Sequence, residues 1–312
     1  MSVSRRAFAG GLVLTMATAF TVVSAGQAAA AGSPTGFGAG TTGGGSTAPV
    51  TVTTAAALAS AAKSSAPAVI RVSGMITVSG MQKVTSNKTV IGVGSGSGIT
   101  GGGLTLSGAT NVIIQNLNFK DSSDDAINVE QSSTKIWIDH NTLSHAHDGL
   151  LDIKRGSDFV TVSWNKFFNH DKTMLLGHSD DNGSQDRGHL RVTYHHNWFD
   201  GTTQRHPRVR FGDPVHVYNN YYAGVTSYGV ASTMEAGVLV EGNYFENVKD
   251  PFHRGEAASP PGALVARNNY LVNSGSGQQG GTVKAIPYTY TVDTPSGVKA
   301  SVQNGAGVGK VG

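Results

Sequence analysis

The sequence predicts an all-β protein in which parallel strands are wound into a coil. Short strand-like runs recur about every 23 residues, an asparagine stands at the same place after each run, and glycine is abundant, with 42 residues among 312. Apolar and polar residues alternate along these runs with a period of two, which disfavours a helical solenoid. A repeat of this length matches one coil of a parallel-strand solenoid.

Each run is followed by an asparagine, any residue and then a large apolar residue. The asparagines are 24, 32, 23, 23 and 26 residues apart, and they are Asn141, Asn165, Asn197, Asn220, Asn243 and Asn269. Because successive coils lie about 4.8 Å apart, their amides are expected to stack and to satisfy the bends between strands. An earlier run, "VIIQNLNF", has no asparagine at the matching place.

The 32-residue interval is predicted to contain a loop that leaves one coil. It includes "DDNGSQDRG", Asp180 to Gly188, nine residues of turn formers and charged groups. Without these residues the interval is 23, which is the ordinary period. A segment of this composition between two periodic runs is typical of a loop.

Residues 1–31 are predicted to be an export signal. Arg5 and Arg6 precede a long uncharged apolar run, and small residues around Ala31 offer a cleavage site. The paired arginines resemble those of twin-arginine signals. The apolar run also approaches the length of a membrane span, but the alanine-rich site favours cleavage. We therefore expect a secreted, extracellular protein.

Residues 32–312 are predicted to form one β-helix domain, with residues 32–50 as either a glycine-rich leader or a cap. The chain has no cysteine, so a large core rather than disulfides must stabilise it. It has 23 basic and 20 acidic residues, and without the two arginines of the signal the basic count is 21. This near-neutral balance favours neither nucleic acid nor a membrane as partner, and we expect a monomer.

Three carboxylates are expected to converge on the outside of the coil. Asp125 and Asp148 are 23 residues apart, one coil, and Asp152 follows four residues later on the same side of an extended run. Like charges this close raise each other's pKa unless a cation neutralises them, and oxygen ligands favour Ca²⁺ before Mg²⁺. Leu150 has the same parity, so this interpretation needs a bend near Gly149. The alternative is a set of solvated turn aspartates.

The same spacing extends the column of charges to two cations. Lys172 follows Asp148 by 24 residues, and Arg205 follows Lys172 by 33, or 24 without the loop. The column therefore passes from an acidic, metal-binding end to a basic end. Such a column suits an extended polyanion that carries carboxylates.

The stretch "QRHPRVRF", residues 204–211, concentrates arginines at the basic end. Arg208 and Arg210 alternate with apolar residues and are expected to face outward. Arg205 has the wrong parity for a straight strand, but a bend at Pro207 can bring it to the same site as Arg210. The planar guanidinium fork suits carboxylates. The alternative is a group of solvated surface arginines.

Four blocks of the sequence carry a family resemblance. "IWIDHNTLSH", "DGLLDIKRG", "MLLGHSDD" and "QRHPRVRFG…VHVYNNYY" occur in this order between Asn111 and Phe252. Together they resemble the pectate lyases of polysaccharide lyase family 1. The resemblance implies a single-stranded right-handed parallel β-helix whose loops form a substrate groove, Ca²⁺ dependence, and extracellular action on polygalacturonate.

The resemblance also implies roles for single residues. A further carboxylate of some members falls near Ser123, which cannot replace it, and the block Trp137–His140 is interpreted as mainly structural. The implied calcium ligands are Asp125, Asp148 and Asp152, the implied substrate-binding residues are Lys172 and Arg210, and the implied catalytic residue is Arg205.

The implied reaction is β-elimination, which yields 4,5-unsaturated oligogalacturonides. The proton on C5 of a uronate is removed and the C4–O bond breaks, while cations neutralise the developing charge. An arginine is ordinarily protonated. Arg205 therefore acts as base only with a sharply depressed pKa, or it stabilises the carbanion while water takes the proton.

Three other functions are alternatives. A pectin lyase acts on methylated polymer and has no need of the acidic column. A polygalacturonase-like hydrolase uses carboxylates as acid and base, and a non-catalytic polysaccharide-binding β-helix is compatible with the fold alone. Neither of the last two has an evident use for the column of lysine and arginine.

Overall fold

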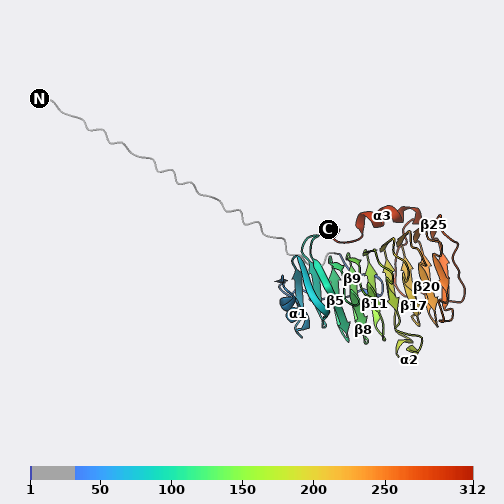
Figure 1. The fold of residues 1–312 in the computed structure, drawn as a ribbon, viewed down its shortest axis with the longest axis horizontal. Coiled ribbons are helices and arrows are strands. Elements are labelled where there is room, and N and C mark those ends of the chain that lie inside the picture. The colour runs from blue at the N-terminus through green and yellow to red at the C-terminus, as the bar shows by residue number, and fades with distance from the viewer. Residues whose placement is uncertain (2–31, 312) are drawn as a thin grey trace.

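The strands of the protein pair in parallel and form two long sheets (Figure 1). The structure is a computed structural model and describes residue 1 and residues 32–311. Each successive coil adds a strand to each sheet, so the predicted parallel β-helix is confirmed. Sheet A has ten strands: β1 (Val50–Val52), β2 (Ala68–Val72), β4 (Lys88–Gly92), β6 (Thr110–Gln115), β9 (Thr134–Asp139), β12 (Asp158–Ser163), β15 (Val192–His195), β18 (Val215–Tyr218), β21 (Gly237–Glu241) and β24 (Ala263–Arg267).

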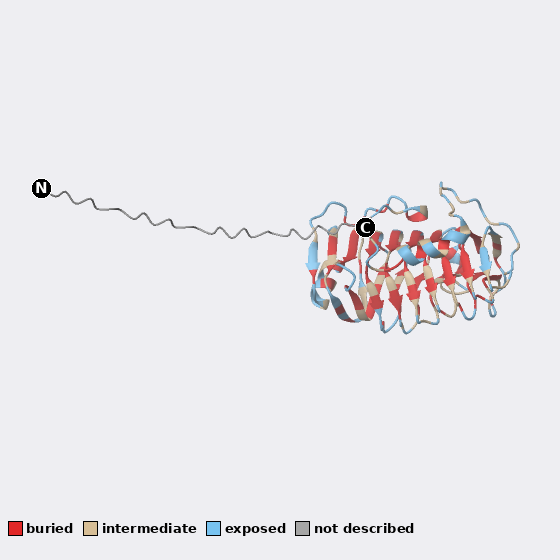
Figure 2. Cartoon of the chain, turned by 90° about the horizontal axis from the view of Figure 1, so that it is seen from above, coloured by how far each residue is buried: buried red, intermediate tan, exposed pale blue. Residues whose placement is uncertain are grey.

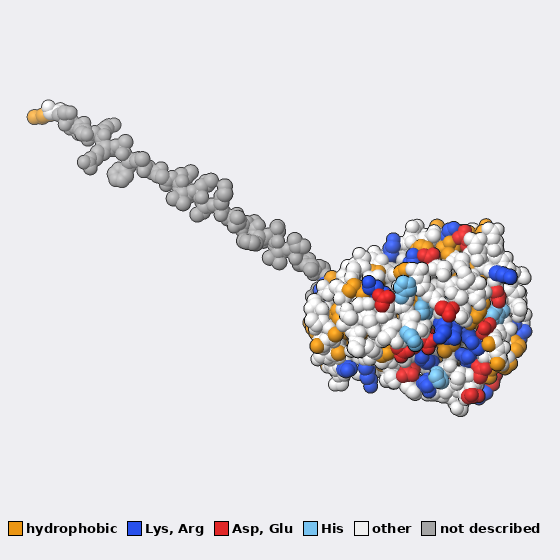
Figure 3. All heavy atoms as spheres, in the orientation of Figure 1, with side chains coloured by type: hydrophobic (Ala, Val, Ile, Leu, Met, Phe, Trp, Pro, Cys, Tyr) orange, Lys and Arg blue, Asp and Glu red, His pale blue; other side chains and the backbone are white. Residues whose placement is uncertain are grey.

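Sheet B consists of two ladders that share the long strand β5 (Gly98–Ser107), with which β3 (Met75–Lys83) also pairs. One ladder contains β7 (Asn118–Lys120), β10 (Thr142–Ser144), β13 (Lys166–Phe168), β16 (Trp198–Asp200), β19 (Tyr221–Ala223), β22 (Tyr244–Glu246) and β25 (Tyr270–Val272). The other, the β8–β23 ladder, contains β8 (Ile127–Glu130), β11 (Leu151–Ile153), β14 (Leu175–Leu176), β17 (Arg208–Arg210), β20 (Val230–Thr233) and β23 (Phe252–Arg254). Charged side chains gather over the middle of the molecule on the side where these strands are seen (Figure 3).

The core fills the inside of the coil, and the turns between strands are exposed (Figure 2). Identical positions of successive coils pack on one another. Phe167, Phe199, Tyr222 and Phe245 stack, with ring centroids 5.3, 4.8 and 4.3 Å apart. Helix α1 (Ala55–Lys63) packs against β2 and β3 at the N-terminal end of the coil.

The predicted asparagine ladder is present and is buried except at its last member, Asn269. The side-chain Oδ1 of Asn165 accepts hydrogen bonds from both the backbone N–H and the Nδ2 of Asn141, at 2.9 and 3.0 Å. The same pair of bonds recurs at each step up to Asn269. The ladder begins at Asn141 because the matching residue of the coil before it is Leu117, which can only donate its N–H to Asn141.

The residue before each ladder asparagine has a left-handed backbone, for example His140, Trp164 and His196, with φ of 51, 52 and 54°. At each such bend the backbone N–H of the asparagine donates to the side chain of the next ladder asparagine, not to a backbone carbonyl. The asparagine amide supplies the missing partner, since it also donates to a carbonyl of the preceding coil, as Asn197 Nδ2 does to Val162 at 2.9 Å. The amides therefore set the register of the coils.

The long interval is a loop, as the sequence predicts. Across it Phe168 pairs with Asp200, whereas one coil earlier Ser144 pairs with Phe168. The extra residues leave the coil as a projection that carries the short helix α2 (Gly183–Asp186) (Figure 1).

The glycine-rich residues after the predicted signal lie along the outer face of sheet A. This segment contains the 3₁₀ turn η1 (Gly36–Gly38), and the backbone N–H groups of Gly38 and Gly44 donate to the hydroxyls of Thr161 and Thr89 at 2.9 and 3.0 Å. The predicted signal, apart from residue 1, lies outside the described residues. Within residues 32–311, no helix is long and apolar enough to cross a membrane.

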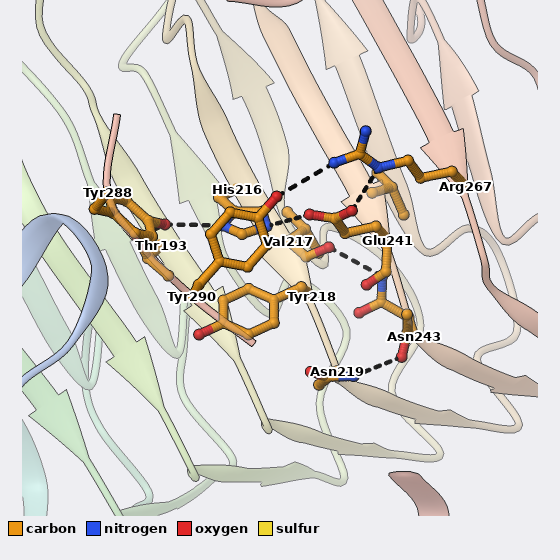
Figure 4. Close-up of polar contacts among 12 residues, drawn as sticks. Thr193, His216, Val217, Tyr218, Asn219, Glu241, Asn243, Arg267, Tyr288 and Tyr290 are labelled. Atoms are coloured by element: carbon orange, nitrogen blue, oxygen red, sulfur yellow. Dashed lines mark hydrogen bonds and ion pairs between the residues drawn. The ribbon is translucent and has the colours of Figure 1, made fainter. Parts of the chain in front are cut away.

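The C-terminal segment also packs on sheet A, through a polar network (Figure 4). The Tyr288 hydroxyl lies 2.8 Å from Nδ1 of His216, whose Nε2 lies 2.9 Å from Glu241, and Arg267 donates to the other oxygen of Glu241 at 2.5 Å. Burial opposes ionisation of Glu241, but hydrogen bonds from His216, Arg267 and Tyr290 lower its pKa to about 2. The segment continues through η2 (Pro295–Gly297) into α3 (Val298–Gly305).

We expect Asn197→Ala to destabilise the fold strongly. The substitution removes the acceptor of two buried donors on Asn165, and such a loss costs about 3 kcal/mol in the free energy of unfolding. Asn304→Ala, on the exposed face of α3, is the control and should change it by less than about 0.5 kcal/mol. Thermal or denaturant unfolding of both variants checks this, and equal losses would contradict the role of the ladder.

Candidate active site

Three carboxylates cluster on the turns that precede β8 and β11. Carboxylate oxygens of Asp124, Asp125 and Asp148 lie within 4.8 Å of one another. Asp125 is buried, whereas Asp148 is partly and Asp124 largely exposed. The prediction that Asp125 and Asp148 meet is therefore confirmed, and Asp124, which the sequence analysis left out, joins them.

Asp152 lies beside Asp125, the buried member of this group, and is itself buried. Its Oδ1 accepts a hydrogen bond from the backbone N–H of Leu175 at 3.0 Å, and that of Asp125 accepts from Gly149 at 2.8 Å. The ammonium of Lys154 bridges the two carboxylates, 3.0 Å from Asp125 and 3.5 Å from Asp152. The sequence analysis missed Lys154, although it follows Asp152 by two residues and so shares its parity.

Burial dominates the electrostatics of this pair. It raises the pKa of Asp152 to about 7, and the charge of Asp125 adds to the effect, while Lys154 opposes it. Burial likewise raises the pKa of Asp125. One ammonium thus faces two buried carboxylates and, nearby, Asp124 and Asp148. Ionisation of the whole group leaves excess negative charge that a further cation would neutralise.

The bend required at Gly149 is present. The successive N–H groups of Leu150 and Leu151 both donate to the carbonyl of Thr173, at 3.1 Å each. One residue is therefore extra relative to the next coil, as in a β-bulge, and both leucines point inward. The bulge therefore removes the conflict at Leu150, and Asp148 lies in the turn before β11.

The cationic end of the column lies on the next coils. Lys172 donates to Asp148 at 3.0 Å, and this contact, with the charges of Lys172 and Arg205, outweighs partial burial and lowers the pKa of Asp148. The register differs from the prediction by one residue, because Lys172 pairs with Gln204. Arg205 follows in a left-handed conformation with φ of 63°, so the chain already bends at Arg205 itself, two residues before Pro207, where the bend was predicted.

A buried histidine fixes the backbone at Arg205. His206 Nδ1 lies 2.9 Å from the carbonyl of Tyr228 on the next coil, and its Nε2 lies 3.1 Å from the hydroxyl of Thr173 on the preceding one. Burial lowers the pKa of His206 to about 4, so the imidazole is neutral. Three coils are thus joined at the residue next to Arg205, and the sequence analysis did not single out this histidine.

Of the two arginines of β17, Arg208 is partly exposed, but Arg210 is buried rather than displayed on the surface as predicted. Val209 and Phe211 are buried, as predicted. Arg210 is held by Asp180, a residue of the projecting loop, through a hydrogen bond of 2.6 Å from its Nε. Beside the column, Asp148 and Lys172 also border a pocket lined by Asp121, His145, His147 and His170.

Comparison with known proteins shows the family. A family model described as pectate lyase matches residues 6–311. This chain belongs to the pectate lyase family. Among curated proteins, the pectate trisaccharide-lyase of Bacillus licheniformis is 38% identical over 237 residues, which cover 72% of this chain and 68% of that protein. Pectate lyase E of Dickeya chrysanthemi is 37% identical over 283 residues, covering 72% of each.

Solved pectate lyase structures share the fold. A pectate lyase from Bacillus sp. N165 in complex with trigalacturonate superposes with a TM-score of 0.83 at 33% identity. The match covers 89% of this chain and 100% of that chain. Pectate lyase II of Xanthomonas campestris gives a TM-score of 0.76 at 31% identity, over 89% and 98%. This pectate lyase is therefore a polysaccharide lyase, as the resemblance of its sequence implied.

We expect Gly149→Ala to disable this pectate lyase. A Cβ at Gly149 would lie 2.3 Å from Oδ1 of Asp152 and 3.0 Å from Oδ1 of Asp125, so the carboxylates must move apart. Displacement of about 1 Å at a catalytic constellation costs about a hundredfold in rate. Gly96→Ala is the control, because nothing lies within 4 Å of its Cβ position. Unchanged activity of a folded Gly149→Ala variant would show that the placement of these carboxylates is unimportant.

Proposed function

We propose that this pectate lyase cleaves de-esterified polygalacturonate by Ca²⁺-dependent β-elimination and releases 4,5-unsaturated oligogalacturonides. The observation that carries the proposal is the acidic cluster of Asp124, Asp125 and Asp148, with Lys172 and Arg205 on the following coils. A polymer of uronates presents carboxylates at regular intervals, and a row of metal-binding and cationic side chains can bind several of them at once. The trigalacturonate bound by the relative from Bacillus sp. N165 supports this choice of substrate.

The donor set suits calcium. The cluster offers carboxylate oxygens as ligands and includes no histidine or cysteine, and hard oxygen ligands of variable geometry favour Ca²⁺. Asp124, Asp125 and Asp148 would hold the ion, with Asp152 behind them as the fourth acidic group. Bound there, the ion would neutralise a uronate carboxylate and the negative charge that develops on it.

The remaining roles fall to the cationic residues. Lys172 and Arg210 are proposed to bind uronate carboxylates, since an ammonium and a guanidinium fork both pair with them. Arg205 is proposed as the catalytic residue that faces C5. Two actions are compatible with this position: removal of the C5 proton, and stabilisation of the carbanion while water takes the proton.

We further propose that the enzyme is secreted and acts outside the cell as a monomer. Support for secretion comes from the paired arginines, the apolar run and the alanine-rich site of residues 1–31. The proposed substrate also supports secretion, because a polysaccharide is degraded outside the cell that takes up its fragments.

Chelation should abolish the activity. The protein is incubated with polygalacturonate, with and without excess chelator, and ultraviolet absorbance follows the unsaturated product. Restoration of the rate by Ca²⁺ is expected, because like charges in the cluster need a cation. Full activity in excess chelator, or preference for methylated polymer, would favour a pectin lyase instead.

Arg205→Lys and Arg210→Lys should differ in their kinetics. Lysine at position 205 keeps the charge but loses the fork and its reach, so kcat should fall by about a hundredfold or more with KM little changed. Lysine at position 210 should raise KM by about tenfold instead, since it weakens a contact made in ground and transition states alike. Steady-state kinetics at saturating Ca²⁺, with circular dichroism as folding control, distinguishes the two. Near-wild-type kcat for a folded Arg205→Lys variant would remove Arg205 from the chemistry.

A further inference from the structure

One carboxylate from the projecting loop is connected to both arginines of β17. Oδ1 of Asp180 accepts a hydrogen bond of 2.6 Å from Nε of Arg210. Both oxygens of Asp180 also lie 2.8 Å from the hydroxyl of Ser259. That hydroxyl in turn lies 2.8 Å from Nη2 of Arg208. Asp180, Ser259, Arg208 and Arg210 are called the latch below.

The direction of the hydrogen bonds in the latch is fixed by chemistry. A guanidinium only donates and an ionised carboxylate only accepts, whereas a hydroxyl has one proton to give. Ser259 must therefore accept from Arg208 and donate to Asp180. Ser259 thus connects the carboxylate of Asp180 to Arg208 through two hydrogen bonds. Arg208 is held further by a bond of 3.2 Å to the carbonyl of Glu256.

The latch is more than a surface ion pair. The side chains of Arg210 and Asp180 are 11% and 35% exposed, and Ser259 is buried. Burial disfavours the charged form of Asp180, but the hydrogen bonds from Arg210 and Ser259 outweigh it and lower its pKa. Charge-assisted bonds in such surroundings are stronger and more directional than exposed ones.

The latch leaves one edge of Arg210 available. Nε is used by Asp180, and Nη1 makes a long bond of 3.4 Å to the carbonyl of Gly177. Within residues 32–311, Nη2 has no hydrogen-bond partner. A guanidinium fixed in this way along one side can present its other side to a bound carboxylate without first losing rotamer freedom.

We propose that Asp180 is a positioning residue of the lyase site: it fixes the guanidinium of Arg210 directly, and that of Arg208 through Ser259, so that both are already oriented for uronate carboxylates. The inference rests on the proposed function, because it names how the arginines of that site are held. It also assigns a use to the loop of residues 180–188, which interrupts the period of the coil.

The rival interpretation is that Asp180 imitates a substrate carboxylate and must be displaced from Arg210. The two ideas predict opposite signs. A positioning carboxylate lowers KM, so its removal raises KM, whereas a competing carboxylate raises KM, so its removal lowers it.

Asp180→Ala should raise KM for polygalacturonate by about tenfold and change kcat little, as expected for loss of a charge-assisted contact that orients a binding group. Ser259→Ala should raise KM by a smaller factor, because it cuts only the route to Arg208. Asp180→Asn keeps an acceptor for Nε and should lie between wild type and Asp180→Ala, which makes it the conservative rescue. If Asp180→Ala does not fold, the other two variants decide the question.

Glu235→Gln is the matched control. Glu235 holds the same loop through an ion pair with Arg187, with bonds of 2.6 and 2.7 Å, and both side chains are more than half exposed. This variant loosens the loop without touching Arg208 or Arg210, and we expect its KM to stay within about twofold of wild type. An effect as large as that of Asp180→Ala would show that the loop, not the carboxylate, is what matters.

A double variant separates positioning from general damage. In an Arg210→Lys background, Asp180→Ala should raise KM further by no more than Ser259→Ala does alone, because only the route through Ser259 to Arg208 is left to lose. Full additivity, or a lower KM in Asp180→Ala alone, would overturn the inference. Failure of the wild-type protein to cleave polygalacturonate is a different result, since it counts against the proposed function and not against the latch.

Discussion

Hydrogen bonds between the side chains of asparagines on successive coils hold the rest of the structure in place. Each amide joins the backbone of its own coil to the next one at a left-handed bend, so one coil cannot slide against its neighbour without breaking buried bonds. The register that results puts residues one period apart about 4.8 Å from each other. Residues one period apart in the sequence therefore lie next to each other along the axis of the coil.

That register explains how a sparsely charged chain builds a strongly charged site. Each end of the site contains one internal counter-ion of opposite sign: Lys154 lies between Asp125 and Asp152, and Asp180 lies against Arg210. Such counter-ions offset the repulsion between clustered like charges in the folded protein, and they fix the orientation of these side chains when substrate is not bound. They leave the exposed carboxylates and one edge of the guanidinium for ligands.

The sequence was sufficient to predict the elements that obey the period. The parallel β-helix, the asparagine ladder, the loop in the long interval and the meeting of Asp125 with Asp148 all follow from counting residues. Counting failed by one at Lys172, which pairs with Gln204, because a left-handed residue shifts the parity at Arg205. It also grouped Asp152 directly with Asp148, whereas Asp152 lies beside Asp125 and is held by Lys154 and the backbone of Leu175. Contacts made by loops could not be predicted in this way: Asp180 and Ser259 are 79 residues apart, and no period relates them.

We propose that this register creates one continuous row of sites, with calcium at the acidic end and cationic side chains beyond it, that binds successive uronate carboxylates. A crystal structure of the Arg205→Lys variant with Ca²⁺ and a tetragalacturonate tests it most directly, because slowed chemistry preserves the substrate. The account predicts an ion bound by Asp125 and Asp148 and bridged to a uronate carboxylate, with the sugar chain running along the β8–β23 ladder toward Arg210. An ion bound elsewhere, or a sugar chain lying across sheet A, would contradict it.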